Sequence, residues 1–141
     1  MSLEGSVALV TGGGRGVGRA IALGLAEDGA TVAVNYRRDD GAASETVSLI
    51  EAAGGRAKAY QASVDDLEED ELMVNQILDD LGPVSILVNN AGIASRGRMV
   101  ADTDAAELQR VVATHAFGPH YLSRLVLPGM RTLERGDIIM I

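Results

Sequence analysis

The 141-residue sequence contains no cysteine and no tryptophan. Without cysteine, neither a disulfide framework nor a thiolate metal site can form, and the redox compartment is left open. No apolar run approaches the roughly 20 residues that a membrane span requires. Residues 1–5 also lack the basic region and the apolar core of a signal peptide. We therefore expect a cytoplasmic protein without a metal site or a membrane partner.

Positive charge is also scarce, because 12 lysines and arginines stand against 20 acidic residues and the net charge is −8. This balance argues against nucleic acid as a partner. Much of the acidic charge lies in residues 65–71. That cluster could form a metal site, an interaction surface or the acidic first turn of a helix. Val74, Ile77, Leu78 and Leu81 follow at helical spacing, so we favour the helix start.

Apolar residues make up 47% of the chain and aromatic residues only 3%, which is typical of a parallel sheet packed between helices. We expect one domain over residues 1–141. Strand patterns fall at residues 7–10, 31–35, 56–61, 85–88 and 137–141. Helical patterns fall between them at residues 19–27, 41–53, 66–81 and 104–127. Right-handed crossovers then predict a doubly wound α/β sheet of the Rossmann type with strand order 3-2-1-4-5.

Two helices carry more detailed expectations. In the first helix, one face is expected to pack against the sheet. Its residues, counted from the end of the preceding turn, are Val17, Ala20, Ile21, Gly24 and Leu25. The last helix is expected to bend at residues 118–119, Gly-Pro, and to end at residues 128–129, Pro-Gly.

Residues 11–18, Thr-Gly-Gly-Gly-Arg-Gly-Val-Gly, lie between the first strand and the first helix. Such a turn aims backbone N–H groups and the positive end of a helix dipole at one point, where phosphate binds. Gly13 and Gly18 have P-loop spacing, but Arg19-Ala20 follow in place of lysine and a hydroxyl residue. The turn therefore predicts phosphate binding without triphosphate hydrolysis. The alternative is a glycine-rich loop without a ligand.

The pattern Thr11-Gly12-x-x-x-Gly16-x-Gly18 resembles the cofactor turn of the short-chain dehydrogenase/reductase family. Residues 89–92, Asn-Asn-Ala-Gly, follow the fourth strand directly and are similar to a second signature of that family. The resemblance implies a nicotinamide dinucleotide at the switch point between strands 1 and 4. The contacts that it implies come from Thr11, Gly12, Gly14, Arg15, Gly16, Val17, Gly18, Asn89, Ala91 and Gly92.

The end of the second strand indicates which dinucleotide is bound. Tyr36 stands about where relatives that prefer NAD usually carry an aspartate, and Arg37 and Arg38 follow it. With Arg15, these guanidinium groups suit a 2′-phosphate, so we expect NADP(H) rather than NAD(H). The alternative for the arginines is a solvated loop. Asp39 and Asp40 come too late to bind the ribose and are expected to be helix caps.

The resemblance also implies adenine contacts at Ser63 and Val64, where Ser63 replaces an aspartate common in relatives. A hydroxyl can still accept one hydrogen bond, so we expect weakened adenine binding.

The family's catalytic serine and Tyr-x-x-x-Lys motif have no counterpart among these residues. Tyr36, Tyr60 and Tyr121 lack a lysine four positions on, and the only lysine is Lys58. His115 stands where relatives carry an asparagine of a proton relay, although a helix-face or interface histidine is the favoured interpretation. The chain should therefore contain no catalytic residue of the core set.

The resemblance covers essentially the whole chain but only the N-terminal portion of a typical member, so we expect a fold truncated after the fifth strand, with an exposed apolar edge. The expected function is an NADP(H)-dependent oxidoreductase acting on a carbonyl substrate such as a 3-oxoacyl thioester, similar to 3-oxoacyl-[acyl-carrier-protein] reductases. The chain would carry the cofactor-binding portion and form a homo-oligomer. The alternative is a truncated or degenerate paralogue that binds nucleotide or a partner without catalysis.

Overall fold

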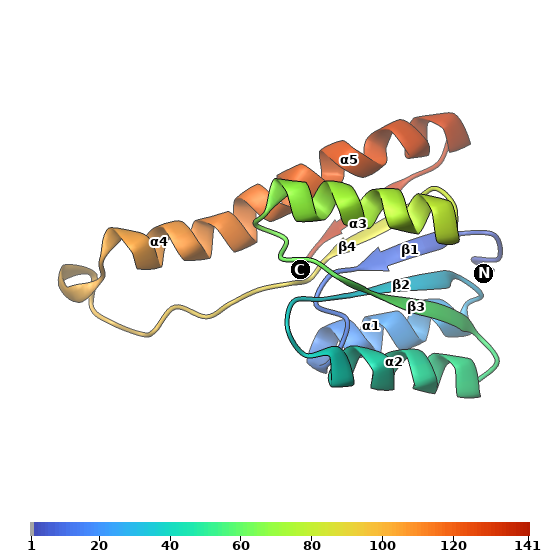
Figure 1. Ribbon diagram of the computed structural model, residues 1–141, viewed down its shortest axis with the longest axis horizontal. Coiled ribbons are helices and arrows are strands. Elements are labelled where there is room, and N and C mark those ends of the chain that lie inside the picture. Colours follow the sequence, from blue (N-terminus) through green and yellow to red (C-terminus); the bar gives the residue numbers. More distant parts are fainter. Residues whose placement is uncertain (1) are drawn as a thin grey trace.

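Five parallel strands form a single sheet in the computed structural model, which describes residues 2–141 (Figure 1). The strands are β1 (Val7–Val10), β2 (Thr31–Tyr36), β3 (Arg56–Gln61), β4 (Ile86–Asn89) and β5 (Asp137–Met140). Their order is β3-β2-β1-β4-β5, and every neighbouring pair is parallel. The predicted Rossmann topology is confirmed.

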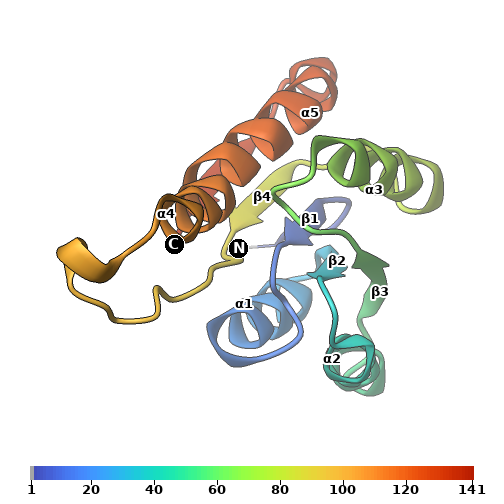
Figure 2. The same cartoon turned by 60° about the vertical axis from the view of Figure 1, so that its left-hand side comes forward.

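Helices cover both faces of the sheet (Figure 2). The helices α1 (Gly16–Glu27) and α2 (Asp40–Ala52) lie on one face, and α3 (Leu67–Asp80) and α5 (Gly118–Leu133) lie on the other. The short helix α4 (Ala105–Val112) and the segment before it lie beyond the carboxyl edge of the sheet. Among residues 2–141, no helix has both the length and the apolar content that crossing a membrane would take.

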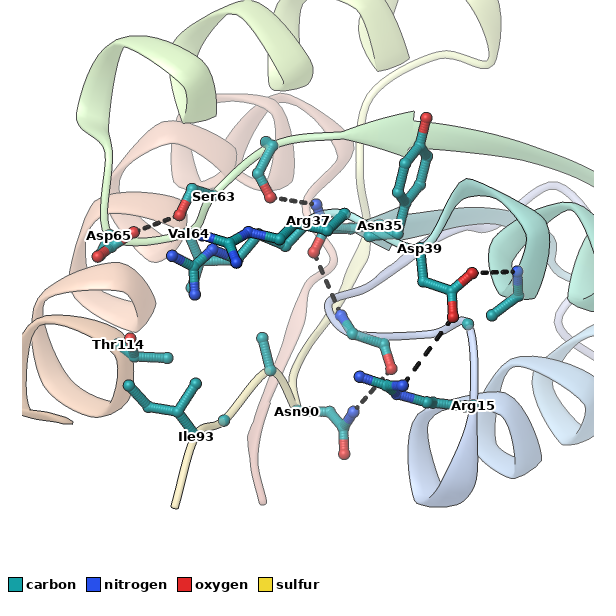
Figure 3. A pocket seen from close by; sticks show the side chains of 18 residues that line it. Arg15, Asn35, Arg37, Asp39, Ser63, Val64, Asp65, Asn90, Ile93 and Thr114 are labelled. Atoms are coloured by element: carbon teal, nitrogen blue, oxygen red, sulfur yellow. Dashed lines mark hydrogen bonds and ion pairs between the residues drawn. The ribbon is translucent and has the colours of Figure 1, made fainter. Parts of the chain in front are cut away.

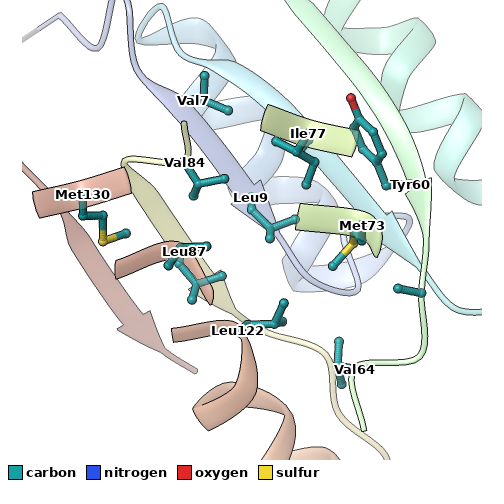
Figure 4. Close-up of a cluster of buried hydrophobic side chains, with 13 residues drawn as sticks. Val7, Leu9, Tyr60, Val64, Met73, Ile77, Val84, Leu87, Leu122 and Met130 are labelled. Carbon is teal, nitrogen blue, oxygen red and sulfur yellow. The ribbon is translucent and has the colours of Figure 1, made fainter. Parts of the chain in front are cut away.

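The central strands are buried on both sides because each face is covered by helices. In β1, Ala8 and Val10 belong to the apolar cluster on the side of α1 and α2. Leu9 points the other way, as alternation along a strand requires, and joins Leu87, Met73 and other residues under α3 and α5 (Figure 4). This burial holds the carboxyl ends of β1, β2 and β4 in fixed positions.

Two of the helix expectations are wrong. The buried residues of α1 are Gly18 and Ala22, whereas Val17 is 61% exposed. The inner face is displaced by one residue because Gly18 packs against the carbonyl of Gly12, where a larger residue would not fit.

The second wrong expectation is the end of the last helix. The helix does not end at Pro128, which lies inside α5. Val126 and Met130 are buried on either side of the proline, and their packing outweighs the missing backbone donor. The predicted interruption near Gly118-Pro119 is a π-helical turn over Ala113–Phe117, directly before α5.

Strand β5 differs from the other strands in its exposure. It lies at one end of the sheet, and all four of its residues are exposed. Three of its four residues, Asp-Ile-Ile-Met, are apolar, whereas the wholly apolar β1 is fully buried. The expected apolar edge is present in the structure.

Candidate functional site

A cavity of about 420 Å³ lies at the carboxyl edge of the sheet, a size typical of ligand sites (Figure 3). Its walls come from the β1–α1 turn, the β2–α2 and β3–α3 loops, the residues after β4, and Thr114 of the π-helical turn. The cavity therefore lies where strand order reverses between β1 and β4, the place at which open α/β sheets bind ligands.

The turn between β1 and α1 is shaped by glycine. Gly12 and Gly16 have φ angles of +61° and +56°, in the left-handed region that glycine adopts without strain. A Cβ on Gly18 would collide with the carbonyl oxygen of Gly12 and would come within 2.5 Å of Asn90 Nδ2. Gly12 is therefore required by its backbone conformation and Gly18 by the lack of space for a Cβ. Together they allow the turn to pass directly beneath the cavity.

Two asparagine side chains hold this turn in place. Asn35 Oδ1 accepts a hydrogen bond from Gly12 N at 3.2 Å, and Asn35 Nδ2 donates to the carbonyls of Tyr60 and Ala62. Asn90 Nδ2 donates to the carbonyls of Thr11 and Gly12 at 3.0 and 3.2 Å. The turn is therefore tied to β2, β3 and the end of β4 by hydrogen bonds within the protein.

Thr11 completes these connections from within the turn. Its hydroxyl accepts hydrogen bonds from the backbone N–H groups of Asn90 and Ala91, both at 2.9 Å. It also donates to the carbonyl of Val88 at 3.3 Å. Thr11 is 2% exposed, so its part in the site is to join β1 to the end of β4.

The N-terminus of α1 is open, in contrast to those of α2, α3 and α4. Asp39, Asp66 and Asp104 cap the latter helices, each accepting a hydrogen bond from a backbone N–H of the first turn. Arg15 precedes α1 without a side-chain cap, and the first turn of α1 has no acidic residue. The backbone donors and the positive end of the α1 dipole therefore remain free for an anion.

Positive side chains line the cavity at the carboxyl edge of the sheet. Arg15, Arg37 and Arg38 all line the cavity, from the turn after β1 and the loop after β2. Tyr36 lines it too, and burial together with Asp40 raises the pKa of its phenol, which therefore stays neutral. Asp39 caps α2 as expected, whereas Asp40 is the first residue of that helix and does not cap it. Asp39 also lines the cavity, with its Oδ2 4.0 Å from Arg15 Nη1.

The end of β3 contributes Ser63, Val64 and Asp65. The Ser63 hydroxyl donates to Asp65 Oδ1, and Ser63 N donates to Glu69 Oε2. The serine that replaces the family's aspartate is thus paired with a carboxylate two residues later, so an acidic group is present at this wall after all.

Ten of the predicted cofactor residues line the cavity: Gly12, Gly14, Arg15, Tyr36, Arg37, Arg38, Ser63, Val64, Ala91 and Gly92. Thr11, Gly16, Val17, Gly18 and Asn89 do not line it; the first four lie in the turn or the start of α1, and Asn89 is buried at the end of β4. The Asn-Asn-Ala-Gly signature suggests an asparagine that ties backbone groups together, and Asn90 does so, whereas sequence reasoning missed Asn35. Only its position near the end of strand 2 could have suggested Asn35.

His115 does not line the cavity but touches the segment that does. Its Nε2 lies 3.1 Å from the backbone N and 2.8 Å from the carbonyl oxygen of Ile93. A Cβ on Gly92 would come within 2.8 Å of its ring. The structure places the histidine against this backbone, and a relay role stays a prediction.

The lysine and the tyrosine of β3 are used elsewhere. Lys58 Nζ and the Tyr60 hydroxyl both bond Asp80 Oδ2, at 2.6 and 2.9 Å, on the edge of the sheet away from the cavity. In the described chain, residues 2–141, no group of His, Cys, Asp and Glu is arranged to hold a metal ion. Asp66 caps α3 and residues 68–70 form its acidic first turn, so the helix-start interpretation of the acidic cluster is confirmed.

A doubly wound sheet with a glycine turn and an open helix N-terminus at its switch point defines a Rossmann-type protein. The family model described as short chain dehydrogenase matches residues 6–141. The chain belongs to this family.

Known proteins agree with this assignment. The short-chain dehydrogenase/reductase homolog YusS of Bacillus subtilis is 46% identical over 75% of this chain and 96% of its own length. Versicolorin reductase 1 of Aspergillus parasiticus is 41% identical over 98% of this chain, which spans only 52% of that protein. A metagenomic short-chain oxidoreductase solved in complex with NADP is 34% identical, with a TM-score of 0.94 over 99% of this chain and 63% of its own.

Proposed function

We propose that this chain carries the cofactor-binding portion of an NADP(H)-dependent short-chain reductase whose substrate is a ketone such as a 3-oxoacyl thioester. The observation that carries the proposal is the uncapped N-terminus of α1, which opens on a cavity lined by Arg15, Arg37 and Arg38. The NADP-bound neighbour and the reductase among the relatives support it.

The residues fit a dinucleotide on structural grounds. The glycine turn leaves no side chain between the backbone and the cavity at Gly12 and Gly14, so a pyrophosphate can reach the first N–H groups of α1. The ribose next to the adenine would then lie at the end of β2, where Arg37 and Arg38 could form charge-assisted hydrogen bonds with a 2′-phosphate. Ser63 and Asp65 offer acceptors for the adenine amino group.

The chemistry that the bound cofactor would supply is hydride transfer to a carbonyl carbon or, in reverse, from the carbon of the corresponding alcohol. This chain's residues hold the cofactor and fix its orientation. No tyrosine–lysine pair lines the cavity within residues 2–141, since Lys58 is held by Asp80. We therefore expect the 141-residue polypeptide to bind the cofactor without reducing a carbonyl substrate.

Calorimetric titration with NADP⁺ and NAD⁺ tests the proposal. We expect binding of both, tighter for NADP⁺, and a loss of that preference in the double variant Arg37→Gln/Arg38→Gln. Arg131→Gln, which removes a positive charge at the far end of α5, is the matched control and should leave the preference unchanged. Failure to bind either dinucleotide would contradict the proposed function.

Turnover is measured separately, as NADPH oxidation in the presence of a 3-oxoacyl thioester. Clear turnover by the purified 141-residue chain would show that the catalytic groups lie among these residues after all. Binding of dinucleotide without turnover is equally expected of a nucleotide-binding subunit. A longer polypeptide containing a Ser and Tyr-x-x-x-Lys set after Ile141 would separate the two, since only the reductase gains turnover from it.

A further inference from the structure

Asp39 belongs to two structures at once. Its Oδ1 accepts a hydrogen bond from Ala42 N at 2.9 Å and so caps α2. Its Oδ2 lies 4.0 Å from Arg15 Nη1, across the mouth of the cavity that both residues line (Figure 3). The carboxylate therefore connects the loop after β2 with the turn after β1.

Capping does not require the negative charge of this residue. Serine and asparagine cap helices about as well as aspartate, because the cap is one oxygen that accepts from a backbone N–H. The charge of Asp39 can therefore have an effect that is separate from capping. The group on which it acts is the guanidinium of Arg15, which lines the same cavity and would be unpaired without Asp39.

We propose that Asp39 is a specificity-determining residue that lowers the preference of this site for a 2′-phosphorylated dinucleotide by competing for Arg15. The proposal rests on the proposed function, since it concerns the same cavity. A 2′-phosphate must take the Arg15 guanidinium from Asp39 and lie near a second negative charge. A 2′-hydroxyl pays neither cost, and it can donate a hydrogen bond to the carboxylate. The three arginines therefore give less discrimination than their number suggests.

The test is the ratio of the dissociation constants for NAD⁺ and NADP⁺, measured by calorimetry at low salt. Asp39→Ser keeps a capping oxygen and removes the charge, and we expect it to raise the ratio in favour of NADP⁺ about fivefold. The gain should shrink in 1 M NaCl, where charges are screened. Asp39→Asn is the second capping variant and should act in the same direction, so that a folding defect in one does not decide the result.

Asp104→Ser is the matched control. Asp104 caps α4 as Asp39 caps α2, and its replacement removes the same charge from a helix start that does not line the cavity. The control should leave the ratio unchanged. In an Arg15→Gln background, Asp39→Ser should produce a smaller gain, because the competition for Arg15 is gone and only the direct repulsion between Asp39 and the 2′-phosphate remains.

An unchanged ratio in both Asp39 variants, an equal gain in Asp104→Ser, or a full gain that persists in Arg15→Gln would each overturn the proposal. These results differ from failure of the proposed function, in which the unmodified chain binds neither NAD⁺ nor NADP⁺.

Discussion

The surroundings of Asn35 and of Asp70 differ sharply, although both polar side chains are buried and both lie near Met73. Asn35 is 2% exposed, and its amide bonds Gly12 N and the carbonyls of Tyr60 and Ala62. Asp70 is fully buried one turn before Met73 on α3, and neither of its carboxyl oxygens has a hydrogen-bond partner among residues 2–141. Nδ2 of Asn35 lies 3.4 Å from the Met73 sulfur.

The difference teaches that partners, and not polarity, decide what a buried polar group does. A satisfied amide stabilises the turn that it joins, whereas a carboxylate without partners costs free energy on burial. Burial, followed by the charges of Asp66, Asp65 and Glu69, raises the pKa of Asp70 to about 8. Asp70 therefore keeps its proton at neutral pH in the folded protein.

The largest effect is expected at Gly18, where the turn that Asn35 helps to hold has no space for a side chain. Gly18→Ala places a Cβ against the Gly12 carbonyl and the Asn90 amide, so it should lower the free energy of unfolding by about 4 kcal/mol and abolish dinucleotide binding. Gly24→Ala in the same helix meets nothing within 4 Å and should instead stabilise by about 0.5 kcal/mol. Urea denaturation measures both. Equal effects of the two variants would show that the turn tolerates side chains.

Removal of the Asn35 side-chain amide should destabilise the same turn by a smaller amount. Asn35→Ala leaves Gly12 N and the carbonyls of Tyr60 and Ala62 without this partner, and we expect a loss of about 3 kcal/mol in urea denaturation. Asn75→Ala, at an exposed position of α3, is the control and should change stability by less than about 0.5 kcal/mol. A similarly small change in stability for Asn35→Ala would show that the hydrogen bonds of Asn35 do not stabilise the turn, and the contrast with Asp70 would be lost.

Asp70→Val should act in the opposite direction and stabilise the protein, by an amount that grows as the pH rises. The pKa of Asp70 is raised from 3.8 in the unfolded chain to about 8 in the folded protein. Between these values the folded state binds the extra proton, so this residue makes stability fall as pH rises, by up to about 1.4 kcal/mol per pH unit.

The gain from Asp70→Val should therefore be small near pH 4, grow with pH, and level off above pH 8. Urea denaturation across this range measures it. Asp79→Val, at an exposed position on the same helix, is the control and should show no such growth. A gain that is independent of pH would mean that Asp70 ionises normally in the folded protein.

The smallest effect concerns a polar group that is only partly buried. Tyr60→Phe removes the hydroxyl that donates to Asp80 Oδ2, and we expect a loss of about 1 kcal/mol. Burial and Asp80 raise the pKa of Tyr60, so its phenol should remain protonated in an ultraviolet titration to pH 10. Tyr121→Phe on α5 is the matched control for stability. Ionisation of Tyr60 below pH 10 would contradict the contact with Asp80.

The sequence was sufficient to predict those features for which the local residue pattern and the chain topology agree. Strand order, the glycine turn and the Asp39 cap follow from short motifs, whose geometry depends on neighbouring residues. The exposure of Val17 and the burial of Asp70 were missed. Each depends on what a helix face meets across space, which helical spacing alone does not specify.

The sequence by itself determined the class of fold and the phosphate-binding turn, because alternating apolar runs and the spacing of glycines restrict the backbone to few arrangements. Only the tertiary structure decided how that turn is held and which charges share the cavity. Asn35, Asn90 and Asp39 reach the turn from other segments of the chain. Such contacts arise when the sheet brings the carboxyl ends of its strands together, so the partners of these side chains cannot be read from spacing along the chain.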